Sequence, residues 1–547
     1  MKIRTYTSGS GLGSFVTLIL LAVIAHFAFS SLGFSPTDDG LTLSGSRRIA
    51  DGQVPHLDFV LIRPALSPLM HVPLIWFGGN YTYLTSRLIV WLQFALMAWL
   101  WVGVVEFLSG WRLSEAERIL LATICGMFSA HNFPIMAWHT IDGLFLISVG
   151  LAMATRARKP VKMLGYALIG AACLCKQGFV FLGPVALLAF DDWRRRDMWL
   201  AWLAPGVGYV ALLLATGAWS DAVTQLLSQH DLMAAGIRPL LTFKVFGGMV
   251  AGFGAMQLLR TTAPGSMAGR RTRSTVALLL FAVPLIFQTV ALSAGTAALK
   301  WSYFLFGSVL GVVLQTLISQ DGALRRLGKA GWMGLAMAWC AALSLGYNAP
   351  VLAAGQLAII LIMAAWGRQG LRAPTYRRLV SALLLTGMVM PSFVWARRHH
   401  IYQDRPAHQL THSLDGVLPG GYGIRTNSDT YAFMLDLRDV ATRLEDSGHL
   451  FAIMPDCAGY WARARTSNPL PVDWHYWVEL NNSKIIHRVT DALDTLQGRA
   501  TVILQKVNTF SPQNGFTPLS VDRFPSVEHV RSSFHLVGES KYFEIRR

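Results

Sequence analysis

The sequence predicts a polytopic α-helical membrane protein that carries a soluble α/β domain at its C-terminal end. Hydrophobic residues make up 53% of the 547 residues, and charged residues only 14%. Soluble proteins average about 25% charged residues. Long apolar runs recur up to residue 396, and the composition after that residue is that of an ordinary soluble protein. We therefore predict a membrane domain, 1–396, and a tail domain, 397–547.

The membrane domain contains about 13 apolar runs that approach the length of a membrane-spanning helix, which takes roughly 17–25 residues. The predicted spans fall at 14–33, 84–107, 118–135, 141–155, 163–175, 178–190, 198–216, 242–259, 275–293, 303–319, 331–346, 351–366 and 379–395. Several of them are short. The break at residue 176, which separates the fifth run from the sixth, depends on a single lysine.

The charges predict how the chain is oriented in the membrane. The membrane domain holds 30 basic and 14 acidic residues, whereas the tail domain holds 17 and 16. Most bases of the membrane domain fall in alternate loops, such as 156–162, 191–197 and 325–329. Basic loops stay in the cytoplasm, so we expect a cytoplasmic N-terminus and an extracytoplasmic first loop, 34–83, and tail. No basic stripe is interleaved with aromatic residues, which argues against nucleic-acid binding.

The tail domain alternates segments of strand and helix character. The predicted strands are 449–457 and 500–507, and the predicted helices are 428–446 and 483–498. Ser428 or Asp429 is the expected N-cap of the first helix, and Gly448 follows its end. This alternation predicts a small α/β domain.

The five cysteines do not form a recognisable framework. Four lie in apolar runs, and Cys457 is alone in the tail domain. Cys173 and Cys175 are two positions apart, so on a helix they point to different faces. We expect neither a disulfide framework nor a cysteine metal site.

The first outer loop begins with two adjacent carboxylates in the stretch "SPTDDG", residues 35–40. Thr37 or Asp38 can cap a short helix that stops at Gly52, and we expect this helix to lie along the membrane surface. Carboxylates in a first turn also suit the helix dipole. Local sequence therefore leaves two interpretations of Asp38 and Asp39, a helix cap or a catalytic pair.

Further ionisable residues stand near the outer ends of predicted spans, where burial at membrane depth costs roughly 2.5–3.5 kcal/mol each. Arg63, next to a proline, suits a phosphate near the lipid headgroups, or it pairs with Asp58. His139 and Asp142 are three positions apart and share a helix face, where Asp142 could also be a cap. Lys176 either binds an anionic group or reaches the interface from a turn.

Together these residues resemble the first outer loop of GT-C class membrane glycosyltransferases, close to the bacterial aminoarabinose transferases and the protein O-mannosyltransferase relatives. The resemblance covers roughly residues 14–190. It rests on Asp38-Asp39, Gly52 with Pro55, Arg63-Pro64, Phe77-Gly78, Arg87-Leu88, Asp142 and the "KQG" at 176–178. Three positions depart from the family: Asp39 stands where glutamate is usual, Gly40-Leu41 where a base follows, and Arg63 replaces lysine. These departures fall at positions expected to contact the donor, so the resemblance does not identify the sugar.

The resemblance implies an enzyme of the bacterial inner membrane. Such an enzyme moves a sugar from a polyprenyl-phosphate donor to an acceptor hydroxyl on the extracytoplasmic side, with inversion. The acceptor is a lipid, a polysaccharide or a protein. A phosphate leaves without a general acid, unlike the leaving group in glycoside hydrolysis, but the acceptor needs a base and the phosphate needs cations.

The resemblance also implies a set of residue roles. They are Asp38 as base, Asp39 and Asp142 as supporting acids, Arg63, Lys176 and Arg87 as donor-phosphate ligands, and His56 and His139 as ligands of the acceptor or of a metal ion. No spacing of histidines forms a metal motif, so the sequence leaves open whether the enzyme uses a divalent metal ion.

Two other classes of function are open. A transporter or flippase of lipid-linked sugar would place its charges near the midplane of two matching halves, whereas these charges lie at outer span ends. An O-antigen ligase or polymerase, or a non-catalytic scaffold, is the other alternative. We expect the tail domain to cover the active site and to select the acceptor. Its aromatic loop at 465–477 either binds sugar by stacking or is a packed surface loop.

Overall fold

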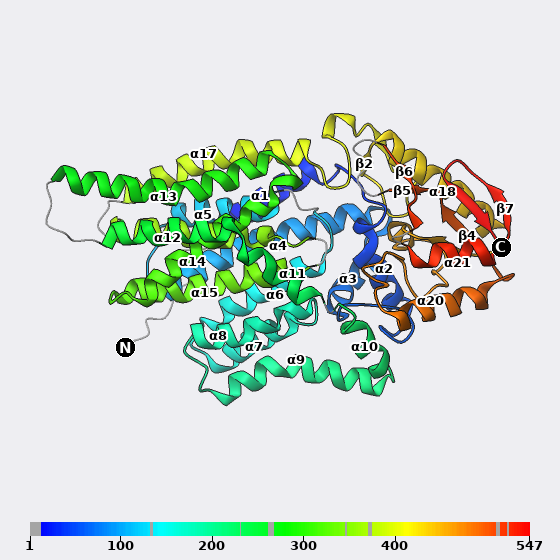
Figure 1. Cartoon of the computed structure of the whole chain (residues 1–547), viewed down its shortest axis with the longest axis horizontal. Helices are drawn as coiled ribbons and strands as arrows, with labels where there is room; N and C mark the ends of the chain where they lie inside the picture. The colour runs from blue at the N-terminus through cyan, green and yellow to red at the C-terminus, as the bar shows by residue number, and fades with distance from the viewer. Residues whose placement is uncertain are drawn as a thin grey trace.

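The computed structural model describes residues 12–131, 135–229, 231–260, 267–344, 347–369, 375–509, 515–521 and 524–547. A bundle of long helices forms one end of the molecule and an α/β domain forms the other (Figure 1). Residues 1–11, the predicted cytoplasmic N-terminus, lie outside the described residues. So do 132–134 and 345–346 at the ends of two predicted spans.

Each predicted span coincides with a helix of the bundle. These helices are α1 (Leu12–Phe29), α4 (Thr82–Ser109), α5 (Glu115–Ala130), α6 (His139–Ala154), α7 (Lys159–Ala172), α8 (Leu182–Ala189), α9 (Arg196–Ala215), α12 (Phe243–Arg260), α13 (Met267–Ser293), α14 (Ser302–Leu317), α15 (Gly322–Ala342), α16 (Ala354–Gln369) and α17 (Thr375–His399). Among the described residues, six helices are long and apolar enough to cross a membrane, or seven if a bent pair that includes α12 counts as one span. The count of about 13 spans is therefore not established.

Short elements connect these helices at the end of the bundle that faces the tail domain. They are η2 (Gln177–Phe181), α10 (Trp219–Leu226), α11 (Leu232–Ile237), η3 (Arg238–Leu241), η4 (Thr296–Trp301) and η5 (Pro350–Ala353). The predicted break at Lys176 is confirmed, because α7 ends at Ala172 and Lys176 precedes η2.

The first outer loop contains α2 (Asp38–Ala50), α3 (Leu66–Phe77) and the short η1 (Gly79–Tyr81). The predicted helix is confirmed as α2, with Thr37 before it and Gly52, in a left-handed conformation, after it. Its predicted position along the membrane surface stays a prediction. Most of its side chains are buried, and the helix lies between the bundle and the tail domain (Figure 1).

The tail domain is built on a four-stranded sheet of order β3-β4-β8-β7. The strands are β3 (Leu450–Met454), β4 (Ala500–Gln505), β7 (Leu536–Glu539) and β8 (Phe543–Arg546). β3 and β4 are parallel, and the other pairs are antiparallel. The remaining elements are η6 (Ala407–Gln409), α18 (Ser428–Asp446), α19 (Ala458–Trp461), α20 (Ser483–Leu496), α21 (Pro525–Ser533) and the two-stranded pairs β1 (His412–Ser413) with β2 (Arg425–Thr426) and β5 (Val507–Asn508) with β6 (Thr517–Pro518).

Both predicted tail strands and both predicted helices are confirmed, but the predicted cap of α18 is wrong by one residue. Asn427 is the N-cap, since its side-chain oxygen accepts the backbone N–H groups of Asp429 and Thr430. An asparagine outside the helix reaches these free N–H groups better than a residue already in the first turn. Gly448 follows the end of α18 in the left-handed conformation, as expected.

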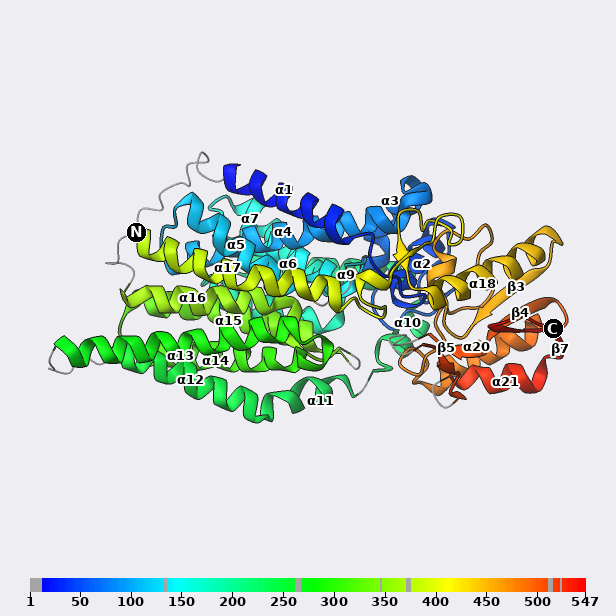
Figure 2. The same ribbon diagram turned by 90° about the horizontal axis from the view of Figure 1, so that it is seen from above.

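The first outer loop and the tail domain share their hydrophobic cores. Phe34 and Leu43 of the loop are fully buried in one cluster with Phe433 and Phe451 of the tail. Ile62 joins a second cluster on the tail sheet. Figure 2 shows the tail domain at one end of the helical bundle, with α2 at the junction. The tail therefore packs directly against the segment that carries the acid pair.

Candidate functional site

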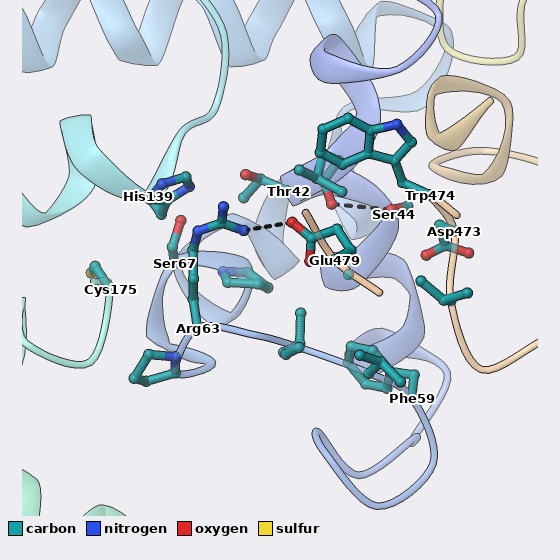
Figure 3. A pocket seen from close by; sticks show the side chains of 17 residues that line it. Thr42, Ser44, Phe59, Arg63, Ser67, His139, Cys175, Asp473, Trp474 and Glu479 are labelled. Carbon is teal, nitrogen blue, oxygen red and sulfur yellow. Dashed lines mark hydrogen bonds and ion pairs between the residues drawn. The ribbon is translucent and has the colours of Figure 1, made fainter. Parts of the chain in front are cut away.

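A cavity of about 410 Å³ lies where the bundle, the first outer loop and the tail domain meet. The loop contributes Asp38 and Arg63 to its wall, and the bundle contributes His139 and Lys176. A smaller cavity adjoins it and shares Arg63 and His139 (Figure 3). The structure thus brings four of the predicted site residues to one space.

Asp38 stands at the first position of α2 and directs its carboxyl toward the cavity. The Tyr402 hydroxyl donates a hydrogen bond of 2.7 Å to Oδ2 of Asp38. Burial raises the pKa of Asp38 to about 6, and the Tyr402 hydrogen bond and the positive charge of Arg63 partly oppose that rise, while the neighbouring Asp39 adds to it. A carboxylate with a raised pKa is a stronger base than a free aspartate and is still mostly ionised at neutral pH.

Arg63 and Lys176 bring two basic groups to the same cavity, where burial and the positive charge of Arg63 lower the pKa of Lys176 to about 7. The Arg63 guanidinium forms a 3.0 Å ion pair with Glu479 of the tail domain (Figure 3). The predicted pairing with Asp58 is wrong, because the Asp58 carboxylate accepts the backbone N–H of Val54 instead. The Lys176 ammonium donates to the carbonyl of Ala341 at 2.9 Å and is buried. A lysine ammonium has three N–H donors, and among the described residues the Ala341 carbonyl accepts one of them, so the ammonium can also donate to a ligand.

Asp39 faces away from the cavity. Its Oδ2 accepts the backbone N–H of Ser35 at 2.8 Å, and its Oδ1 pairs with Arg87 at 2.9 Å. Arg87 also donates to the carbonyls of Ser30 and Gly33. Its donors are committed to the backbone, and it does not line the large cavity. The structure therefore does not place Arg87 to bind a donor phosphate, and Asp39 and Arg87 instead hold the start of α2.

Asp142 is likewise separated from the cavity. Its carboxylate is fully buried and accepts hydrogen bonds from Ser67 at 2.6 Å and Gln93 at 2.8 Å, and it pairs with His71 at 3.0 Å. These partners come from α3 and α4, so Asp142 ties α6 to both helices. His139, three residues earlier on α6, does line the cavity. His139 and Asp142 were expected to share a face of α6, but only the His139 side chain reaches the cavity.

His56 is outside the candidate site. Its two ring nitrogens lie 3.0 Å from Gln225 and 2.7 Å from Tyr209, and the ring is fully buried. His56 therefore does not line the candidate cavity, and its role in binding the acceptor or a metal stays a prediction. In the part of the chain that the structure describes, no three His, Cys, Asp or Glu side chains are arranged to hold a metal ion. All five cysteines are free, as expected.

The tail domain holds the segment that carries Asp38. The Gly459 N–H donates to the Pro36 carbonyl at 2.7 Å, and the Thr37 hydroxyl donates to Asp456. Burial raises the pKa of Asp456 to about 8. The backbones of Gly40 and Gly459 touch, because a Cβ on Gly40 would lie 2.2 Å from the Gly459 Cα. This approach requires glycine at position 40, and the Pro36 carbonyl oxygen, 2.6 Å from a Cβ on Gly459, requires it at position 459.

Replacing Gly40 by alanine is expected to destabilise the contact between α2 and the tail domain by about 1–3 kcal/mol, as overpacking does in cores. Thermal unfolding of the purified full-length protein in detergent measures the effect. Gly103→Ala is the matched control, since a Cβ there meets no atom within 4 Å. Equal unfolding temperatures for both variants would contradict the close packing.

Sequence reasoning missed two residues of the site, Tyr402 and Glu479. Tyr402 follows α17 directly, and its position just beyond the last predicted span was the only signal available. Glu479 stands in the tail with no motif around it, so nothing in the sequence indicated that it meets Arg63. The aromatic loop at 465–477 was partly anticipated: Trp474, together with Tyr476, lines the cavity.

No family model and no curated protein matches the chain. Among solved structures, the chain is similar to ArnT from Cupriavidus metallidurans bound to undecaprenyl phosphate, at 13% sequence identity and a TM-score of 0.44 over 98% of each chain. The apo form of the same protein matches at 13% identity and a TM-score of 0.43, over 98% of this chain and 97% of that one. Similarity at this level assigns no activity to this chain.

Proposed function

We propose that the protein is an integral-membrane glycosyltransferase. It transfers a sugar from a polyprenyl-phosphate donor to an acceptor hydroxyl on the extracytoplasmic side of a bacterial inner membrane, with inversion at the anomeric carbon. The observation that carries the proposal is the single cavity lined by a basic carboxylate, Asp38, and by two cations, Arg63 and Lys176. The acceptor is a lipid, a polysaccharide or a protein.

The proposed reaction needs one base and one binding site for an anion. The acceptor oxygen attacks the anomeric carbon while its proton passes to the Asp38 carboxylate. The bond from the anomeric carbon to the phosphate oxygen breaks, and the polyprenyl phosphate leaves with the electron pair. Arg63 and Lys176 stabilise the negative charge that develops on that phosphate. In the free protein, Glu479 neutralises Arg63 until the phosphate arrives.

Asp39, Arg87 and Asp142 support this reaction from outside the cavity. Asp39 and Arg87 hold the start of α2 and so fix the base in place. Asp142 joins α6 to α3 and α4, and thereby positions His139 on α6 and the segment before α3 that carries Arg63. His139 lies at the cavity wall, where it can donate to or accept from the acceptor.

The pH dependence of transfer should follow the ionisation of Asp38. Only the ionised carboxylate accepts a proton, so kcat/KM rises as the pH rises through about 6. The Tyr402 hydrogen bond favours the ionised form. Tyr402→Phe should therefore raise the pKa of Asp38 and move the acid limb of the profile to higher pH.

A pH profile of kcat/KM for the wild type and for Tyr402→Phe tests this expectation. Tyr422→Phe is the control, because that tail tyrosine packs on Tyr81 and does not line the cavity. An acid limb that stays in place or moves to lower pH in Tyr402→Phe would contradict the assignment of the base.

The proposed function is tested with purified protein in liposomes that contain a panel of labelled polyprenyl-phosphate sugars. Transfer of label to an envelope extract, with release of polyprenyl phosphate, supports a transferase. Movement of the intact labelled lipid between leaflets without transfer would favour a flippase. Formation of a longer lipid-linked glycan would favour a ligase or polymerase.

A further inference from the structure

We propose that Trp474 and Tyr476 of the tail domain form a binding platform for a sugar ring inside the large cavity. The proposal deepens the proposed function and rests on it for the reaction, but the binding of a sugar can be measured without any transfer. It assigns to the tail domain a direct contact with substrate.

The two aromatic side chains stack on each other. Their ring centroids are 5.0 Å apart and their planes differ by 10°, which is an offset stack. Both rings line the cavity that also contains Asp38. In an offset stack each ring covers part of the other, and Trp474 is almost fully buried, so the partly exposed ring of Tyr476 offers most of the aromatic face that can pack on apolar C–H groups.

The platform is held in place before a ligand binds. Tyr476 packs against Phe524 at 5.6 Å and against Trp477 at 5.8 Å. Trp474 is only 7% exposed, and its backbone bridges to Asp456, which bonds to the segment that carries Asp38. A surface that is already ordered loses little conformational entropy when a ligand binds. Such a surface can therefore bind a ligand whose individual contacts are weak.

Amide side chains accompany the platform in the same cavity. Asn348 and Gln229 line the wall, and neither side chain makes a hydrogen bond to another described residue. An amide both donates and accepts, as the hydroxyl groups of a sugar require. Cavities that bind small molecules combine an apolar surface with a few such polar groups, which set the orientation of the ligand.

This combination favours a sugar ring over the other ligands a membrane enzyme meets. A polyprenyl chain offers no hydrogen bonds to the two amides. A phosphate matches Arg63 and Lys176 but has no apolar face to place on aromatic rings. A pyranose or furanose ring has an apolar face of C–H groups and a rim of hydroxyls, so it satisfies both features at once. The ring belongs either to the donor or to the acceptor.

The platform is tested by saturation-transfer NMR on the full-length protein with a panel of methyl glycosides of hexoses, pentoses and aminosugars. The ring protons of at least one glycoside should be saturated in the wild type. Tyr476→Leu removes the aromatic face and should weaken that binding by about tenfold, the usual value of an aromatic contact. Tyr476→Phe keeps the ring and should bind like the wild type.

Tyr422→Leu is the matched control, because that tail tyrosine packs on Tyr81 and does not line the cavity. It should leave glycoside binding unchanged. Thermal unfolding of each variant separates a lost platform from a lost fold. Equal binding in Tyr476→Leu and the wild type, or no saturation of any glycoside at its solubility limit, would overturn the proposal.

Two further measurements separate this proposal from the proposed function and identify the source of the ring. Asp38→Asn should lower transfer by about 10²–10⁴-fold but retain glycoside saturation. Glycoside binding by a wild-type protein that transfers no sugar would defeat the proposed function and leave the platform standing. With labelled donor and no acceptor, slower release of the sugar to water in Tyr476→Leu assigns the platform to the donor sugar. Unchanged release with reduced transfer assigns it to an acceptor sugar.

Discussion

Replacing Asp38 by asparagine is expected to lower the rate of sugar transfer by about 10²–10⁴-fold, the range that loss of a general base produces. The amide keeps the size of the side chain and still offers an oxygen to the Tyr402 hydroxyl, which lies 2.7 Å from the carboxylate. Because the packing is preserved, the loss would report on proton transfer rather than on folding.

Initial rates of transfer from a labelled polyprenyl-phosphate sugar measure this effect. Asp51→Asn is the control, since that carboxylate stands at the other end of α2 in a partly exposed pair with Arg47. The Asp38 variant should unfold at the wild-type temperature and should still bind polyprenyl phosphate. Full activity in Asp38→Asn would exclude Asp38 as the base.

Replacing Lys176 by glutamine should lower transfer by about 10²–10³-fold, the usual cost of removing one donor that stabilises a developing charge. The Lys176 ammonium is buried at the cavity wall, where it donates to the Ala341 carbonyl and lies 5.9 Å from the centre of the Phe179 ring. Glutamine can keep that hydrogen bond, but it carries no charge for the leaving phosphate.

The measurement is kcat and KM for the donor together with binding of polyprenyl phosphate alone. Lys244→Gln is the matched control, because the Lys244 ammonium lies 4.8 Å from the centre of the Trp301 ring and does not line the cavity. If both variants bind polyprenyl phosphate and react like the wild type, Lys176 is not a phosphate ligand.

The fold could be predicted well wherever hydrophobic pattern decides structure. All the predicted spans coincide with helices, and the break at Lys176 is present, because a charged residue ends an apolar run. The tail strands and helices were also identified. How many helices cross the membrane could not be predicted, because a short or charged helix inside a bundle has the same local pattern as a short span.

The candidate site was predicted less completely, because it is assembled from distant segments. Asp38, Arg63, His139 and Lys176 share a cavity, and Trp474 faces it from the tail domain. His56 is of the same residue type as His139, and Asp142 of the same type as Asp38, and both are near span ends. Each of them is nevertheless hydrogen-bonded to other buried side chains. Composition and spacing do not reveal such partners.

The sequence by itself determined where the helices form, where the acid pair stands and which cations follow it. Only the tertiary structure decided how the pair is divided between two tasks. Successive residues on a helix point about 100° apart, so one carboxylate of the pair faces a cavity when the other faces a neighbour. The packing of Gly40 on Gly459 and the pairing of Asp39 with Arg87 set the rotation of α2. That rotation directs Asp38 into the cavity. It is set by contacts with residues that are distant in the sequence, and the local sequence pattern of the helix does not contain this information.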